Sequence, residues 1–182
     1  MLKPFKVLSE KTLFEVPGRY QIISAELQTP ENKNTVWTYL KAKEGVVVLP
    51  LDRENNVYLK LEWRLNRKDF VWELPGGWVE EPAPTAEQIK AAANRELQEE
   101  IGLKAKKLEE LIAIYPFNHL ANKFHLFLAQ DLVPSQLPKD ENEYVEIQKL
   151  SFTKAYDLVM RNQVPNGQLA VLFLLVKQRL NL

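Results

Sequence analysis

The sequence predicts an α+β or α/β sandwich in which β-strands are combined with a few α-helices. Residues 5–48 are rich in strand-forming side chains. The clearest helical pattern lies between Thr85 and Ile101, and two helical segments near 153–162 and 168–180 complete the chain. The length of 182 residues suits one domain, or one domain with an added arm.

The N-terminal part predicts an antiparallel β arm. Strand formers flank Pro17-Gly18, which is a turn signal. The polar segment 29–34 is typical of a hairpin loop, and residues 35–40 alternate in the manner of a strand. We therefore expect one domain built from an arm over residues 1–43 and a core over residues 44–182.

The core begins with a series of predicted strands. Residues 45–49 form a short continuous apolar run, which is typical of a strand buried on both faces. Residues 52–56 predict a turn, and residues 57–63 and 70–74 predict two more strands. Pro75-Gly76-Gly77 is expected to end the last of these.

The helix over residues 85–101 has clear start and stop signals. Thr85 can cap its N-terminus, and Gly102 suits a left-handed cap at its C-terminus. Apolar residues four apart give it one buried face: Ile89, Ala93, Leu97 and Ile101. Beyond this helix, the sequence predicts strands over residues 108–115, 124–132 and 144–150.

The composition excludes several classes of function. The chain has 24 basic and 24 acidic residues, and this balance argues against broad binding to nucleic acid or to an anionic membrane. The absence of cysteine excludes disulfides, zinc–thiolate sites, iron–sulfur clusters and cysteine nucleophiles, and two histidines cannot build a three-histidine metal site. The longest apolar run, residues 170–176, is far too short to span a bilayer, so we expect a cytoplasmic protein.

The most informative segment is residues 95–103, which read Arg-Glu-Leu-Gln-Glu-Glu-Ile-Gly-Leu. On a helix, Glu96, Glu99 and Glu100 share one face because they are three or four residues apart. Like charges at this spacing repel, and a bound divalent cation reverses the repulsion because hard cations such as Mg²⁺ prefer carboxylate oxygens. An ordinary solvated acidic face is the alternative. The upstream Gly76-Gly77 favours the functional interpretation, since glycine leaves the backbone open to a metal or a phosphate.

These residues resemble the Nudix box, whose pattern is a Gly, five residues, a Glu, seven residues and then Arg-Glu-apolar-x-Glu-Glu-x-Gly-apolar. Glu87, the seven residues after it and residues 95–103 fit this pattern. Between Gly77 and Glu87 the chain has nine residues where the pattern has five. The difference requires either an enlarged loop or an earlier start of the helix. It leaves open whether Glu87, Glu80 or Glu81 takes part in the site.

The resemblance implies an α/β/α sandwich with a mixed sheet, and cleavage of a nucleoside diphosphate that is linked to another group. It implies Glu96 and Glu100 as the main ligands of Mg²⁺, with Mn²⁺ as an alternative ion, and the backbone carbonyl of Gly76 as a further ligand. Glu99 is expected to assist at the metal and in catalysis, and Arg95 to hold the glutamates in position. The cation would offset the charge of the diphosphate and lower the pKa of the attacking water, so no protein nucleophile is required.

A polar loop over residues 140–143 follows Pro138 and precedes an apolar strand. In the related enzymes an acidic loop at this place supplies the general base. The resemblance therefore implies Glu141 as the first choice for the base and Glu143 as the second. A solvated acidic turn is the alternative for each of them.

The wider chain resembles the ADP-ribose pyrophosphatase and nucleoside-diphosphate-sugar hydrolase group in its N-terminal arm and in residues 45–49, 61–64 and 72–76. In that group the arm commonly joins two subunits and helps build the partner's nucleotide pocket, which implies a homodimer. Two departures are visible. Pro116 lies thirteen residues after Leu103, where the group often has a proline fifteen or sixteen residues after its box, and residues 62–64 read Glu-Trp-Arg where the group has Gln-Tyr-Arg.

Four side chains outside the box are candidates for substrate contact. Arg64 and Arg67 can offer forked hydrogen bonds to phosphates, and the alternative is that they are ordinary surface arginines. Trp37 and Tyr39 share one strand face and can stack on a base or pack in a dimer interface, although packing in a core is the commoner outcome.

The leading hypothesis is Mg²⁺-dependent hydrolysis of a nucleoside diphosphate sugar, such as ADP-ribose or GDP-mannose, to a nucleoside monophosphate and a sugar phosphate. The second is a Nudix hydrolase of nucleoside triphosphates or dinucleoside polyphosphates, against which the long arm argues. The third is a noncatalytic nucleotide sensor, against which the presence of all three glutamates argues. The expected partner is a small-molecule substrate, with no nucleic acid and no membrane.

Overall fold

The computed structural model describes residues 2–138, 144–161, 163–164 and 166–182. The chain divides into two compact units, one of residues 1–43 with 115–123 and one of residues 44–114 with 124–182. The first unit therefore includes a segment from the middle of the chain that the sequence assigned to the core. In the described part of the chain, no helix combines the length and the apolar character needed to span a bilayer.

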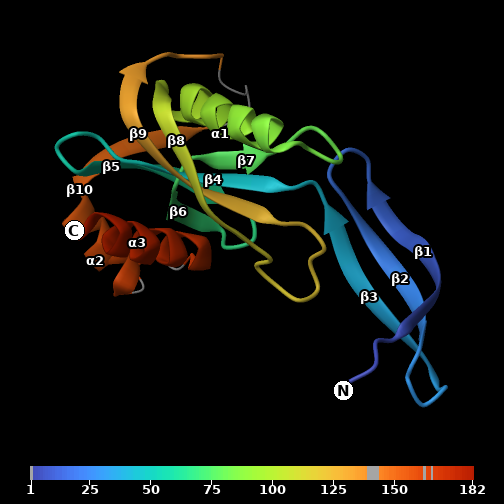
Figure 1. Ribbon diagram of the computed structural model, residues 1–182. Coiled ribbons are helices and arrows are strands. Elements are labelled where there is room, and N and C mark those ends of the chain that lie inside the picture. Colours follow the sequence, from blue (N-terminus) through green and yellow to red (C-terminus); the bar gives the residue numbers. More distant parts are fainter. Residues whose placement is uncertain (1, 139–143, 162, 165) are drawn as a thin grey trace. The chain divides into compact units, whose positions relative to one another are not determined.

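The first unit contains β1 (Lys6–Val16), β2 (Tyr20–Gln28) and β3 (Asn34–Ala42). These strands form one antiparallel sheet in the order β1-β2-β3, drawn in blue in Figure 1. The turn between β1 and β2 contains Gly18 at φ 73°, a conformation that glycine adopts without strain. The antiparallel N-terminal arm predicted from the sequence is confirmed.

The described residues of the second unit form seven strands: β4 (Gly45–Pro50), β5 (Asn56–Arg64), β6 (Asp69–Glu73), β7 (Gly76–Trp78), β8 (Leu103–Ile114), β9 (Phe124–Pro134) and β10 (Val145–Ser151). A mixed sheet has the order β7-β4-β9-β8, in which β4 and β9 run parallel and the other neighbours antiparallel. A second, antiparallel sheet has the order β10-β5-β6.

Three helices complete the second unit: α1 (Ala86–Ile101), α2 (Phe152–Met160) and α3 (Gly167–Leu180). At the start of α1, the Thr85 hydroxyl accepts a hydrogen bond from the Gln88 N–H, and the Gln88 side chain accepts one from the Thr85 N–H. The helix ends at Gly102, which has φ 70°. Both predicted caps are confirmed, so the extra residues after Gly77 enlarge the loop and do not start the helix earlier.

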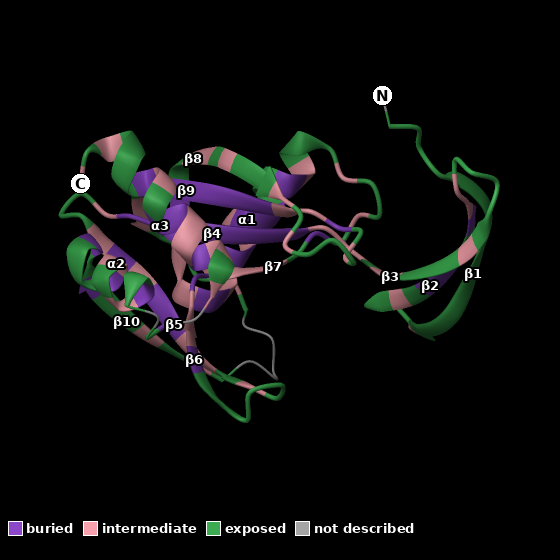
Figure 2. Ribbon diagram, turned by 90° about the horizontal axis from the view of Figure 1, so that it is seen from below, coloured by how far each residue is buried: buried purple, intermediate pink, exposed green. Residues whose placement is uncertain are grey.

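The mixed sheet lies between two hydrophobic cores. Along β4, Val46 and Val48 pack in the core under α1, whereas Val47 and Leu49 pack in the core that contains α2 and α3. Figure 2 shows β4 buried along its whole length, as its continuous apolar run predicted, and the first half of β9 mostly buried beside it. Helices therefore cover both faces of the mixed sheet, and the α/β/α sandwich is confirmed.

Two strands differ from the sequence prediction. The segment expected to be only a turn, around Gly76 and Gly77, forms β7 and pairs with β4. Glycine is a poor strand former, but a Cβ added at Gly76 would collide with the carbonyl oxygen of Val46, so close packing overrides propensity here. Strand β8 begins at Leu103 instead of residue 108, because Ala105 alone is buried among charged neighbours and gives only a weak apolar pattern.

The turn between β4 and β5 is organised by one carboxylate. Asp52 accepts hydrogen bonds from the backbone N–H groups of Glu54, at 3.0 Å, and Asn56, at 2.8 Å, and it pairs with Lys149 at 2.6 Å. Burial by itself would raise the pKa of Asp52, but Lys149 and Asn56 outweigh burial and lower it to about 2.

A lowered pKa means that the Asp52 carboxylate stabilises the fold above its unfolded pKa, and that this stabilisation is lost as the pH falls towards 2. We expect Asp52→Asn to reduce the free energy of unfolding at pH 7 by about 2 kcal/mol. The deficit relative to the parent should shrink between about pH 4 and pH 2 in urea denaturation. Asp131→Asn, which removes an exposed ion pair with Arg53, is the control and should cost less than about 1 kcal/mol. An equal deficit for Asp52→Asn at every pH would contradict this account.

Candidate active site

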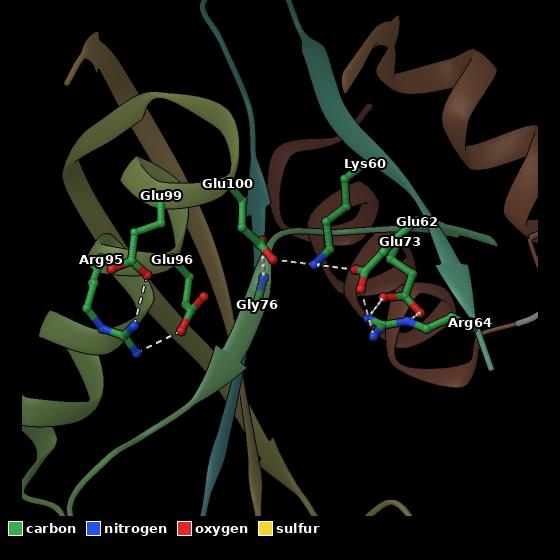
Figure 3. Close-up of polar contacts among 9 residues, drawn as sticks. All are labelled: Lys60, Glu62, Arg64, Glu73, Gly76, Arg95, Glu96, Glu99 and Glu100. Carbon is green, nitrogen blue, oxygen red and sulfur yellow. Dashed lines mark hydrogen bonds and ion pairs between the residues drawn. The ribbon is translucent and has the colours of Figure 1, made fainter. Parts of the chain in front are cut away.

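The three glutamates predicted for the metal site lie on one face of α1 (Figure 3). Glu96 and Glu100 are buried, with 6% and 1% of their surface exposed, and Glu99 is partly exposed. A buried carboxylate is costly unless cations or N–H groups reach it. The surroundings of Glu96 and Glu100 must therefore neutralise them.

Arg95 binds two of these glutamates at once. Its Nη2 donates to Glu96 Oε1 at 2.7 Å and to the backbone carbonyl oxygen of Trp78 at 3.0 Å. Its Nη1 donates to Glu99 Oε2 at 2.9 Å. The guanidinium thus links the acidic face of α1 to the end of β7. This geometry suits the positioning role predicted for Arg95, which stays a prediction.

Strand β7 brings bare backbone against the acidic face. The Gly76 N–H donates to Glu100 Oε2 at 2.9 Å. A Cβ added at Gly77 would lie 2.5 Å from Glu96 Oε1, so a side chain there would take the space of the Glu96 carboxylate. The lack of a side chain at Gly77 is therefore required for the Glu96 carboxylate to occupy this position.

A buried lysine lies on the other side of Glu100. Lys60, on β5, is 2% exposed, and its ammonium donates to Glu100 Oε1. The same ammonium forms an ion pair with Glu62 Oε2 at 3.0 Å. Figure 3 shows Lys60 between these two carboxylates, which come from α1 and β5.

The chain of alternating charges continues along β5. Arg64 forms an ion pair with Glu62 Oε1 at 3.0 Å and a forked pair with Glu73 of β6, in which Nε donates to Oε1 at 3.1 Å and Nη2 donates to Oε2. Lys60, Glu62 and Arg64 alternate in sequence, so their side chains leave the same face of β5. A continuous line of charge thus runs from Glu100 to Glu73.

The burial and charges of this line change the titration of its members. Burial raises the pKa of Glu100 to about 7, although Lys60 and the Gly76 N–H favour its charged form. Burial disfavours the charge of Lys60, but Glu100 and Glu62 outweigh burial and raise its pKa. Lys60 therefore remains a cation at neutral pH. A divalent cation near Glu100 would favour the carboxylate form, in the same direction as Lys60.

This polar line opens into a cavity of about 300 Å³. Its walls include Lys60, Glu62, Arg64 and Glu73 on one side, Gly76, Gly77 and Trp78 of β7, Phe124, and Asn166 and Gln168 at the start of α3. The cavity therefore combines carboxylates, a forked arginine and aromatic walls. This combination suits a charged small molecule that also carries an apolar or ring-containing part.

The predicted metal ligands are near one another but are held by other partners. In the described residues, no group of three or more His, Asp or Glu side chains is arranged to hold a metal ion. The physical reason is that Arg95 engages Glu96 and Glu99, while Lys60 and the Gly76 N–H engage Glu100. The metal-ligand roles of Glu96, Glu99, Glu100 and Gly76 stay predictions.

Glu80, Glu81 and Glu87, the further glutamates near the box, lie in different elements. Glu87 is exposed in the first turn of α1, roughly 13 Å along the helix axis from Glu96. Glu80 is exposed and Glu81 is partly exposed in the enlarged loop. The candidate bases Glu141 and Glu143 lie outside the described residues.

The four candidates for substrate contact have different surroundings. Arg64 lines the cavity, whereas Arg67 is exposed in the turn between β5 and β6. Trp37 and Tyr39 belong to the first unit, where they line a hollow of about 970 Å³. Trp37 is 57% exposed. Packing in a core, which is the commoner outcome for such a residue, is therefore the wrong prediction for Trp37. The Tyr39 hydroxyl donates to Glu10 at 3.1 Å.

Sequence reasoning did not select Lys60, Glu62 or Glu73 as functional residues. The signal available was the alternation of Lys60, Glu62 and Arg64, which predicts one charged face on a strand that is otherwise apolar. The alternation does not reveal Glu100 as the partner of Lys60, because the two residues are 40 positions apart.

Comparison with known proteins agrees with the geometry. The family model described as "NUDIX domain" matches residues 41–172. The chain is 28% identical to the ADP-ribose pyrophosphatase of Bacillus subtilis (strain 168) over 176 residues, which cover 91% of each chain. It is 25% identical to the ADP compounds hydrolase NudE of Escherichia coli (strain K12), over 68% of this chain and 66% of that protein.

The crystal structure of an ADP compounds hydrolase has the same fold. The two structures superpose with a TM-score of 0.86 at 22% identity, covering 100% of this chain and 96% of the other. The Nudix model covers α1 and the residues that line the cavity, and the carboxylate face lies where the box pattern predicted it. The chain therefore belongs to the Nudix family and is a Nudix hydrolase.

Proposed function

We propose that the protein hydrolyses the pyrophosphate bond of a nucleoside diphosphate sugar, such as ADP-ribose or GDP-mannose, to a nucleoside monophosphate and a sugar phosphate. The observation that carries the proposal is the cavity lined by Arg64, Lys60 and the bare backbone of β7, where Lys60 and the Gly76 N–H contact Glu100 of α1. The similarity to a protein named ADP-ribose pyrophosphatase supports this substrate class.

The donor set fits a divalent cation, which Nudix hydrolases generally use. Glu96, Glu99 and Glu100 offer carboxylate oxygens, the ligands that Mg²⁺ and Mn²⁺ prefer. The contact of Gly77 with the Glu96 carboxylate leaves no room for a side chain at this place. These three glutamates would hold the Mg²⁺, and Mn²⁺ is an alternative ion. When bound, the ion would offset the charge of the diphosphate and lower the pKa of the attacking water.

The residues of this chain would bind and orient the substrate. Arg64 lines the cavity with a partly exposed guanidinium, which Glu73 and Glu62 fix in place, so its remaining N–H groups would donate to a phosphate oxygen. Trp78 and Phe124, whose ring centroids are 5.6 Å apart, would shield the reacting phosphates from bulk water. Arg95 would keep Glu96 and Glu99 oriented. Glu141, or else Glu143, would accept the proton of the attacking water.

We further propose that the protein is a homodimer joined through its N-terminal arm. Support comes from the apolar side chains that the arm exposes, among them Phe14, Val36 and Trp37. Exposed apolar surface of this kind commonly marks an interaction site. Trp37 and Tyr39 would then stack on the base or pack between subunits. A cytoplasmic location stays a prediction.

The reaction class can be tested with a panel of ADP-ribose, GDP-mannose, UDP-glucose, NADH, diadenosine polyphosphates and dGTP, each with Mg²⁺ and with EDTA. We expect cleavage of a nucleoside diphosphate sugar that requires Mg²⁺ and falls about a hundredfold or more in Glu100→Gln, because that variant loses a carboxylate beside the reacting phosphates. Glu109→Gln, which changes a surface carboxylate paired with Arg179, should retain full activity. Preference for dGTP or for dinucleoside polyphosphates would contradict the proposed substrate class.

The close contact at Gly77 gives a second prediction. In Gly77→Ala the new methyl group would displace the Glu96 carboxylate, so we expect Mn²⁺ affinity to fall roughly tenfold or more. The melting temperature should change little, because the displaced atoms are the end of a flexible side chain. In the control Gly167→Ala, the added Cβ has no neighbour within 4 Å among the described residues. Unchanged Mn²⁺ affinity of Gly77→Ala in calorimetric titration would argue against Glu96 as a ligand.

A further inference from the structure

Both oxygens of Glu100 already have partners in this protein. The Lys60 ammonium donates to Oε1, and the Gly76 N–H donates to Oε2 at 2.9 Å. Glu100 is 1% exposed and Lys60 is 2% exposed, so water does not compete for this pair. A divalent ion that approached Glu100 would have to share or replace the lysine.

Lys60 cannot easily leave this position. Its other carboxylate partner, Glu62, is joined to Arg64, and Arg64 is joined in turn to Glu73. Withdrawal of the ammonium from Glu100 would leave a buried carboxylate without a cation, which is costly. Lys60 therefore supplies a fixed positive charge next to Glu100 on the acidic face of α1.

Five carboxylates and three cations form the connected groups, which leaves two negative charges when all are ionised: Glu62, Glu73, Glu96, Glu99 and Glu100 with Lys60, Arg64 and Arg95. Without Lys60 the excess would be three negative charges, and the uncompensated charge would lie at Glu100.

We propose that Lys60 is a built-in cation beside Glu100 that takes the place of one divalent ion, so that the protein without substrate binds a single divalent ion. The proposal rests on the divalent-ion requirement of the proposed function but not on the identity of the substrate. Removal of the lysine charge opens Glu100 to a second ion or strengthens the binding of the first. A purely structural ion pair would lower stability without changing ion binding.

Ion binding itself tests this inference. Mn²⁺ would be titrated into the metal-free full-length protein at pH 7.5, with free Mn²⁺ followed by electron paramagnetic resonance and the heat by calorimetry. We expect one ion per chain in the parent. Lys60→Met and Lys60→Gln should bind a second ion, or the first at least roughly tenfold more tightly, because a charge that repels the ion is removed. The Gln amide can still donate to Glu100, so this variant serves if the Met variant does not fold.

Two controls separate charge from structure. Lys60→Arg keeps the positive charge and should bind one ion with the parental affinity. Lys149→Met removes a lysine that pairs with Asp52 away from the cavity, and it should leave Mn²⁺ binding unchanged. The melting temperature of each variant with and without Mn²⁺ gives an independent reading, and the ion should raise it more in Lys60→Gln than in the parent.

The outcomes are distinguishable. One ion in the parent, and the same number and affinity in Lys60→Gln, would overturn this inference and leave the proposed function intact. Two ions in the parent would overturn it in the same way. No Mn²⁺ binding by the parent would overturn the divalent-ion requirement of the proposed function, and this inference with it.

Discussion

The buried carboxylates of Glu96 and Glu100 are the constraint on which the rest of the site depends. Charged carboxylates removed from water are stable only where cations or N–H groups reach them. Three elements meet this requirement: Arg95 on α1 itself, the Gly76 N–H on β7, and Lys60 on β5. The acidic helix, the glycine strand and the charged face of β5 therefore form one electrostatic unit.

The fold places these elements by ordinary packing. The apolar face of α1 packs on β4, which is buried on both sides. This contact places the C-terminal part of α1, which carries the glutamates, against β7. Strand β7 can approach because its two glycines have no side chains to hold it away from Val46 and Glu96. Strand β5 belongs to the second sheet, and its Lys60 and Arg64 side chains line the same cavity as β7.

Local patterns were enough to predict much of this architecture. The caps Thr85 and Gly102, the buried run of β4 and the hairpins of the arm all depend on residues near one another in sequence, and each was found where expected. The box pattern likewise predicted the shared face of Glu96, Glu99 and Glu100. The missed features depend on contacts between distant residues: β7 forms in spite of its glycines, and Lys60 meets a carboxylate on another element. The exposed Trp37 was misjudged because exposure follows from the surroundings of a strand and not from its alternation.

Lys60 and the proposed divalent ion would both offset the charge of the glutamates. A lysine supplies a charge that the protein itself places, whereas a metal supplies a larger charge that exchanges with solvent. We propose that the acidic face of α1 beside β7 binds the divalent ion. The most direct test is anomalous diffraction from crystals grown with Mn²⁺. We predict a peak within about 2.5 Å of carboxylate oxygens of Glu96, Glu99 or Glu100, next to β7. An ordered Mn²⁺ found only elsewhere on the protein would contradict it.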